Sequence, residues 1–168
     1  FWTVSFAQSN NWLRAGDSDF ESGSTAWKAF GAGTAEVTDN PSGSGKVLKF
    51  SGAEGKSWAS AALDIRGIVQ ANAKKASKIK ISMDIYTQTQ QNPYLTVRTQ
   101  DQSLSIAAAA GNTYPRIGTV KTVPGEWTRL EGEFTVTDAD LKNTGTWTLC
   151  LDNLAAYADV YYIDNVTI

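Results

Sequence analysis

The sequence has no histidine and a single cysteine, Cys150, among its 168 residues. Without histidine, Ser-His-Asp and Cys-His nucleophilic sites are excluded, as is any zinc site that needs imidazole. One cysteine cannot form an internal disulfide. Only 19% of the residues are charged and the net charge is −2, which disfavours nucleic acid and anionic membranes as partners. No apolar run approaches the roughly 20 residues of a membrane span.

Uncharged polar residues and glycine are plentiful instead, and such a surface suits neutral polyhydroxylated ligands better than phosphates. The length fits one domain with a sizeable core. The chain starts at Phe1, with neither an initiator methionine nor a signal-peptide pattern, so we expect an excised or processed piece of a larger protein.

Short runs rich in Val, Ile, Thr and aromatics alternate with Gly, Asn, Pro and Ser clusters, which is typical of an all-β domain. The predicted strands are 25–31, 35–38, 46–51, 57–63, 78–87, 94–100, 113–120, 128–136, 146–152 and 159–168, with a helical turn at 68–75. Strands at this spacing predict a two-sheet antiparallel β-sandwich over residues 19–168. Residues 1–18 are interpreted as an edge strand or a packed flap, or alternatively as a junction with a neighbouring module.

Strand alternation predicts which side chains leave the core. In strand 78–87 the apolar residues occupy the odd positions, which turns Tyr86 outward. The same reasoning turns Arg98 and Asp152 outward in their strands, and it puts Trp58 on a polar outer face. We interpret three other tryptophans as core residues, because each falls at or beside the apolar, inward-facing positions of its strand: Trp27, Trp127 and Trp147.

The outward set mixes flat aromatic rings with amide, carboxylate and guanidinium groups. Sugar rings stack on aromatic faces and their hydroxyls need planar polar partners, so this mixture suits a carbohydrate. Scattered surface aromatics are also ordinary, and only the pairing of Trp58 with Tyr114 favours a binding role. The candidate surface comprises Trp58, Tyr86, Tyr94, Tyr114, Gln88, Arg98, Gln100 and Asp152.

Acidic residues near the two ends of the domain form a candidate metal site. Asp19 and Glu21 flank Phe20, which can enter the core while both carboxylates face one side; Asp164 is a further acid near the end of the chain. Hard oxygen ligands of this kind suit Ca²⁺, although solvated turn acids would give the same pattern. No pair of acids is singled out for glycoside hydrolysis.

Three segments in order resemble carbohydrate-binding modules of families 4, 9, 16 and 22, with xylan-binding family 22 and family 4 the most similar. DFESG at 19–23, followed by Ala26-Trp27, resembles their opening segment. VPGEWTRLEGEF at 123–134 resembles their "PGEWT.L.G.F" strand, and YYIDNV at 161–166 resembles their closing "YIDDV".

The resemblance implies a jelly-roll sandwich with a concave cleft on one sheet that holds an extended β-1,4-linked glycan. Trp58 and Tyr114 match the family's cleft tryptophan and tyrosine, and Asp152 corresponds to its cleft acid. Phe30 stands where the family has an arginine, and Cys150 where it has a tyrosine. The family has a structural calcium ion, and the resemblance implies that its ligands here are the side chains of Glu21 and Asp164 and the backbone oxygens of Asp19 and Lys46.

These observations predict a non-catalytic module that binds xylan, or another β-1,4-glycan, and targets an attached glycoside hydrolase. We expect an extracellular bacterial protein, secreted or attached to the cell surface, that is monomeric. The predicted ligand-binding residues are Trp58, Tyr114, Asp152, Gln100, Arg98, Tyr86 and Phe30. Two alternatives remain open: an adhesion or protein-interaction domain, and a small jelly-roll glycan lyase or hydrolase.

Overall fold

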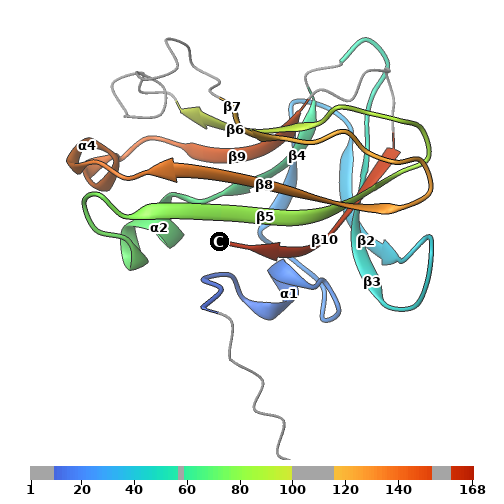
Figure 1. The fold of residues 1–168 in the computed structure, drawn as a ribbon, viewed down its shortest axis with the longest axis horizontal. Helices are drawn as coiled ribbons and strands as arrows, with labels where there is room; N and C mark the ends of the chain where they lie inside the picture. The colour runs from blue at the N-terminus through green and yellow to red at the C-terminus, as the bar shows by residue number, and fades with distance from the viewer. Residues whose placement is uncertain (1–9, 57–58, 100–115, 153–159) are drawn as a thin grey trace, which may run out of the picture.

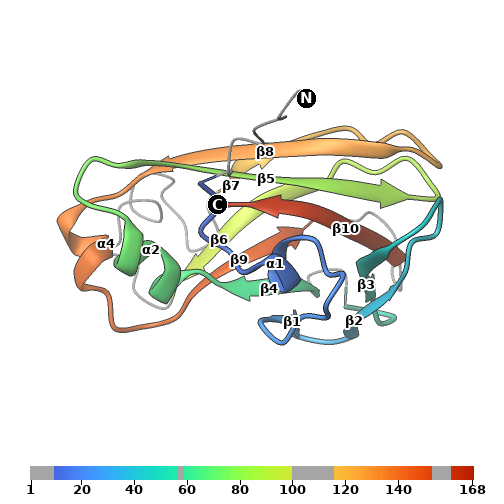
Figure 2. The same ribbon diagram turned by 90° about the horizontal axis from the view of Figure 1, so that it is seen from below.

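The computed structural model describes residues 10–56, 59–99, 116–152 and 160–168, without the side chains of Tyr94 and of residues 96–99. The strands in this part of the chain form two five-stranded antiparallel sheets that pack face to face (Figures 1 and 2). Sheet A has the order β1-β4-β9-β6-β7, and sheet B the order β2-β3-β10-β5-β8. The strands are β1 Trp27–Phe30, β2 Thr34–Asp39, β3 Lys46–Ser51, β4 Ser60–Asp64, β5 Lys78–Thr87, β6 Tyr94–Thr99, β7 Arg116–Thr119, β8 Trp127–Thr135, β9 Trp147–Asp152 and β10 Val160–Thr167.

The predicted two-sheet sandwich is confirmed, and β3 and β5 have the predicted bounds. The helical turn expected at 68–75 is the helix α2, Arg66–Asn72. Two further short helices, α1 (Ala15–Ser18) and α4 (Asp138–Lys142), were not predicted. Within the described ranges, no helix has the length and apolar character needed to cross a membrane.

The core fills the space between the two sheets. On β5 the odd positions Ile79, Ile81, Met83 and Ile85 are all buried, as their alternation predicts. Phe20, Trp27 and Trp147 are buried as well, which confirms the core interpretation for these two tryptophans and the inward direction of Phe20.

Tyr161 on β10 joins the two sheets through a hydrogen bond in the core. The backbone N–H of Ala61 on β4 donates to its hydroxyl at 2.8 Å, and the hydroxyl donates to the carbonyl oxygen of Leu151 on β9 at 3.4 Å. Complete burial raises the pKa of the Tyr161 hydroxyl well above its ordinary value of 10.0. A residue of sheet B thus fixes the spacing of two strands of sheet A.

The edge strands β7 of sheet A and β8 of sheet B approach each other backbone to backbone. A Cβ atom on Gly118 would collide with the carbonyl oxygen of Glu131, and one on Gly132 would lie 2.8 Å from the carbonyl oxygen of Ile117. Glycine at both positions therefore allows the sandwich to close along this edge.

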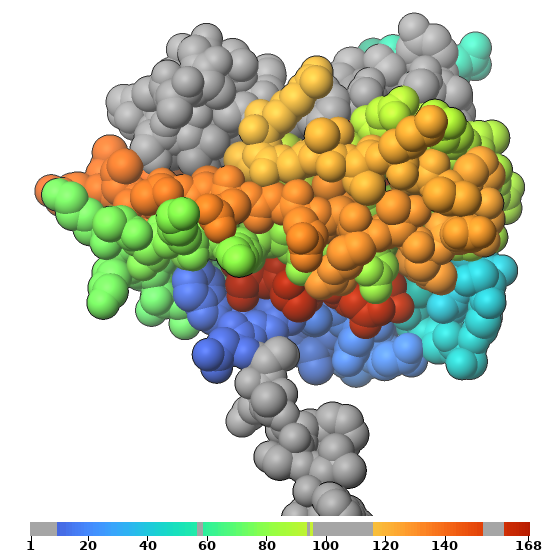
Figure 3. Space-filling view, viewed as in Figure 1, coloured from blue at the N-terminus to red at the C-terminus, as the bar shows by residue number. Residues whose placement is uncertain are grey.

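Residues 10–18 form a flap on β10 and contain no strand. Residues 1–9 of the predicted edge strand or flap lie outside the described residues. The N–H of Trp12 donates to the carbonyl oxygen of Ile168 at 2.9 Å. The side chains of Asn11 and Ser18 donate to the carbonyl oxygen of Val166 at 2.8 and 2.6 Å. The space-filling view shows these N-terminal residues (blue) next to β10 (red) (Figure 3).

Candidate functional site

The outer face of sheet A carries alternate residues of β4 and β9. Leu149 and Leu151 of β9 belong to the core, so Cys150 and Asp152 lie on the outer face. Both are nevertheless buried, with 0% and 6% of their surface exposed. Asp152 therefore has the outward phase that the sequence predicts, and it is well shielded from bulk water.

A straight line of residues crosses this face of sheet A. Phe30 on β1 is the register partner of Ser60 on β4, and Asp152 on β9 is the partner of Tyr94 on β6. The β4–β9 register places Ser60 and Asp152 opposite each other. Four adjacent strands thus align an aromatic residue, a hydroxyl, a carboxylate and a second aromatic residue, at a strand spacing of about 4.8 Å.

Ser60 is the least expected member of this line. Its side chain is fully buried, and its hydroxyl has no hydrogen-bond partner among the described residues. Buried hydroxyls nearly always have a partner, because leaving one unpaired costs about 1–3 kcal/mol. Sequence reasoning missed Ser60, although its alternation phase is that of Trp58 and could have identified it.

A hollow of ≈ 240 Å³ lies beside this line, where β1, β4 and β9 run next to each other. Lys28 and Asp64 are exposed at its border, and Phe30 and Thr148 are partly buried. An ammonium group, a carboxylate, a hydroxyl and an aromatic ring thus surround an apolar floor, the mixture that a polar ligand with an apolar face requires. The residues lining the hollow are Ala26, Lys28, Ala29, Phe30, Ala62, Asp64 and Thr148.

The other predicted ligand-binding residues divide into two groups. Trp58, Gln100 and Tyr114 lie outside the described residues. The backbone of Arg98 is on β6 opposite Thr148, in the sheet that holds Asp152.

Tyr86 is on the other sheet, which corrects its predicted place in the same surface as Asp152. It points outward as predicted, but β5 belongs to sheet B. Alternation states only that a side chain leaves the core, and each sheet has an outer face of its own.

Trp127 also differs from its prediction. It is partly buried on the outer face of sheet B and not in the core, because Leu130 and Phe134 set the inward phase of β8. Its indole Nε1–H donates to the hydroxyl of Ser42 at 2.8 Å.

Two of the predicted metal ligands, Glu21 and Lys46, are in contact at the turn that precedes β3. A carboxylate oxygen of Glu21 accepts a hydrogen bond from the backbone N–H of Lys46 at 2.9 Å. A Cβ atom at Gly45, whose φ is +92°, would collide with the same carboxylate oxygen. Phe20 has a φ of 60°, a left-handed conformation that non-glycine residues adopt rarely. The backbone is thus held in unusual conformations on both sides of the Glu21 carboxylate.

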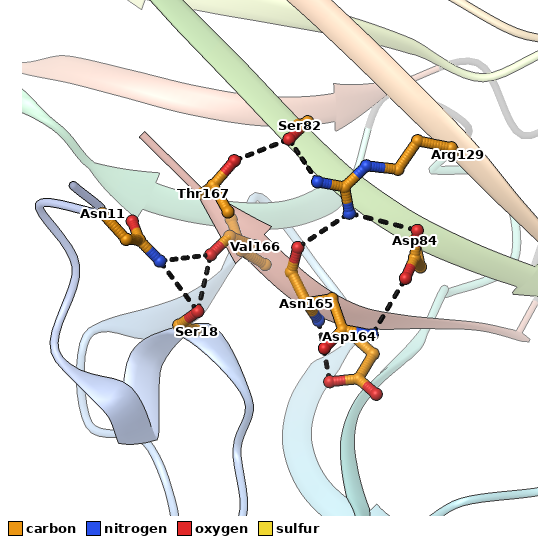
Figure 4. A network of polar contacts seen from close by, with 9 residues as sticks. All are labelled: Asn11, Ser18, Ser82, Asp84, Arg129, Asp164, Asn165, Val166 and Thr167. Carbon is orange, nitrogen blue, oxygen red and sulfur yellow. Dashed lines mark hydrogen bonds and ion pairs between the residues drawn. The ribbon is translucent and has the colours of Figure 1, made fainter. Parts of the chain in front are cut away.

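Asp164, the third acid, belongs to a polar network on β10 (Figure 4). One oxygen of the neighbouring Asp84 pairs with Arg129 at 3.1 Å, and the other accepts from the amide of Asn165 at 2.9 Å. Burial raises the pKa of Asp164, and the negative charges of Asp84, Glu21 and Asp19 raise it further, against a lowering by the hydrogen bond from the Asn165 backbone.

The predicted metal ligands therefore come from separate segments, but they do not complete an all-carboxylate site. No three acidic, cysteine or histidine side chains of the described part of the chain are grouped closely enough to hold a metal ion. An ion held by Glu21 and Asp164 would need backbone carbonyl oxygens and water as further ligands, which Ca²⁺ accepts.

A family model described as a carbohydrate binding domain matches residues 16–149. The chain belongs to this family. The predicted family group is confirmed, and so is the classification as a carbohydrate-binding module and not an enzyme. No curated protein matches the chain in sequence.

Solved structures of carbohydrate-binding modules share the fold. The CBM22-1 xylan-binding domain of Paenibacillus barcinonensis Xyn10C superposes with a TM-score of 0.68 and 20% identity over 89% of each chain. The CBM22-2 domain of that protein gives 0.69 and 18% over 89% of this chain and 95% of the other. The CBM22-1–GH10 modules of Clostridium thermocellum Xyn10B, complexed with xylohexaose, give 0.62 and 15% over 84% of this chain and 25% of the other.

Proposed function

We propose that this carbohydrate-binding domain binds xylan, or a related β-1,4-linked glycan, on the outer face of sheet A. The observation that carries the proposal is the line of Phe30, Ser60, Asp152 and Tyr94 across four strands. A line with an aromatic residue at each end and two polar residues between them matches an extended chain of sugar rings, which have apolar faces and hydroxyl-bearing edges. The structural similarity to modules described as xylan-binding supports xylan as the first ligand to test.

The predicted ligand-binding residues, apart from Tyr86, divide by role in this proposal. Trp58, Tyr114 and Phe30 stack on sugar rings, since aromatic faces favour apolar C–H surfaces. Asp152 accepts hydrogen bonds from sugar hydroxyls, and its burial strengthens them because a shielded carboxylate competes with little water. Arg98 and Gln100 donate to ring and hydroxyl oxygens. Tyr86 has no part in this site.

Calcium is the proposed structural ion, with Glu21 and Asp164 as side-chain ligands and Asp19 and Lys46 as backbone ligands. The close approach of the Gly45 backbone to the Glu21 carboxylate and the raised pKa of Asp164 support this assignment. A divalent cation would neutralise the acids that repel one another, and so it would stabilise the packing of residues 19–21 against β3 and β10.

The proposed biological context is extracellular, on a monomeric module that keeps an attached glycoside hydrolase close to its substrate. A solved relative in which the module is joined to a GH10 module supports this arrangement. The domain itself would retain the polysaccharide and leave it intact.

Affinity electrophoresis in gels that contain xylan, glucomannan, hydroxyethylcellulose or β-glucan tests the proposal. We expect retardation by xylan, and we expect Trp58→Ala to abolish it while the protein remains folded. Asp152→Asn should weaken retardation, because an amide presents one acceptor fewer, and Asp138→Asn, an exposed change in α4, serves as its control. Normal mobility of the unmodified chain in every gel would refute glycan binding. Unchanged mobility of the Trp58→Ala protein would refute the site.

A further inference from the structure

A second aromatic surface lies on the outer face of sheet B, apart from the proposed site on sheet A. Tyr162, Tyr86 and Trp127 are direct register partners on β10, β5 and β8. The ring centroid of Tyr86 is 5.9 Å from that of Tyr162 and 5.5 Å from that of Trp127. All three side chains are partly exposed. We call these three residues the aromatic row; it spans about 10 Å across three strands.

Two ion pairs lie beside the aromatic row. Lys49 continues the row on β3, and its ammonium group lies 3.7 Å from Glu36 on β2. The next line of residues along β5 and β8 holds the ion pair between Asp84 and Arg129 at 3.1 Å. These pairs engage the ammonium and guanidinium groups, and Asp164 on β10, in register with Asp84, adds a carboxylate to this line. The surface therefore favours a neutral ligand over an anionic one.

The shape of the surface favours a linear ligand. The row is one residue wide, with the Asp84–Arg129 pair on one side and the exposed amide of Gln88 at the end of β5 on the other. The core of a protein interface is instead a broad patch from which charged groups are depleted. A narrow aromatic line with polar groups along its sides matches a chain with apolar ring faces and hydroxyl edges.

The same face is hollowed farther along β5 and β8. A hollow of ≈ 470 Å³ is bordered by Lys80, Ser82, Glu131, Glu133 and Thr167, together with Ile81, Ile117 and Gly132. The space-filling view shows β10 (red) set back between β8 (orange) and the N-terminal residues (blue) (Figure 3). Hydroxyl and carboxylate groups therefore continue on this face beyond the aromatic row.

We propose that the aromatic row is a second binding surface for a linear neutral polysaccharide, on the side of the sandwich opposite the first. The proposal takes its ligand class from the proposed function, but it rests on different residues and on the other sheet. With both surfaces occupied, one domain would hold two polysaccharide chains, or two stretches of the same chain.

Titration with xylohexaose and with cellohexaose, monitored by amide and indole NMR signals, tests the proposal. The Trp127 indole N–H, assigned through Trp127→Phe, should shift progressively with at least one hexasaccharide, and it should still do so in the Trp58→Ala protein. Tyr162→Ala should weaken this titration at least tenfold, whereas Tyr162→Phe, which keeps the ring, should not. Thr135→Ala, an exposed position four register lines away and outside the lining of the hollow, is the control on the same face.

Tyr86→Leu guards against loss of folding, because leucine keeps apolar bulk while it removes the flat ring; we expect the same tenfold weakening. A Trp127 signal that stays fixed while the amides of Phe30 and Ser60 titrate would overturn the second surface and leave the proposed function standing. If neither the Trp127 signal nor the amides of Phe30 and Ser60 shift with either hexasaccharide, both the second surface and the proposed function would be overturned. If the aromatic row docks another protein instead, the Trp127 signal should stay fixed while the amides of Phe30 and Ser60 titrate.

Discussion

Replacing Tyr161 by phenylalanine removes one oxygen from the contact between the sheets. The N–H of Ala61 then loses its acceptor inside the core, and the long 3.4 Å hydrogen bond to Leu151 is lost as well. An unsatisfied buried donor costs about 1–3 kcal/mol, so we expect the free energy of unfolding to fall by about 2 kcal/mol. For a domain of this size that corresponds to a decrease in Tm of about 4–8 °C.

Thermal unfolding at pH 8, followed by circular dichroism, measures this difference. Tyr162→Phe is the matched control, since Tyr162 is the next residue on β10 and its ring is partly exposed on the outer face of sheet B. We expect the Tm of this variant to remain near that of the unmodified chain. Equal Tm values for the two variants would refute the role of the Tyr161 hydroxyl as a tie between the sheets.

The pH dependence provides a second check on the same residue. The pKa of Tyr161 is raised in the folded state, so its neutral form stabilises the fold fully below the ordinary pKa of about 10 and loses this contribution as the pH rises above it. The Tm difference between the unmodified chain and Tyr161→Phe should therefore shrink above pH 10. A constant difference would contradict this reasoning.

Two further predictions concern the proposed calcium site. Gly45→Ala should lower stability by about 1–3 kcal/mol in chemical denaturation, because its φ of +92° strains any residue with a Cβ. Gly43→Ala, whose Cβ would make only an ordinary contact at 3.9 Å with the Asn40 side chain, should change little, and equal losses would contradict the role of the Gly45 conformation. EDTA should lower the Tm of the unmodified chain but not that of Asp164→Asn. A chelator effect retained by the Asp164→Asn variant would exclude Asp164 as a ligand. Since the pKa of Asp164 is raised, the EDTA-treated chain should also lose stability as the pH rises from about 3.8 through the raised pKa.

Local alternation predicted the parts of the fold that depend on one strand at a time. The bounds of β5 and the burial of Ile79, Ile81, Met83 and Ile85 follow from the period of two in the sequence. The outward phase of Asp152 follows in the same way. Burial on one face is a property of each strand, so it can be deduced without knowing the strand's neighbours.

Sheet membership was not predictable by the same reasoning. Tyr86 and Asp152 both point outward, but their strands lie in different sheets, because pairing joins segments far apart in the chain, such as β4 with β9 and β5 with β10. Trp127 was misinterpreted for a related reason: β8 begins at this residue, where the apolar phase of a strand is hardest to determine.

Some missed features did carry a local signal. The start of α4 is a capping box, in which Thr137 and Asp140 bond each other's backbone N–H groups, and the Thr-x-x-Asp spacing is visible in the sequence. The buried, unpaired hydroxyl of Ser60 is different. Its phase could be deduced, but its lack of a partner depends on the three-dimensional surroundings.

The close contact of β7 with β8 has a consequence for solubility. Exposed strand edges can pair with strands of other molecules, and natural proteins suppress this by shortening or covering them. Here the four-residue edge strand β7 lies against the edge of the other sheet, with glycines that allow the backbones to touch. Enlarging Gly118 would separate the two strands and uncover both edges. A module that gathers in high density along a polysaccharide would then risk aggregation through these edges.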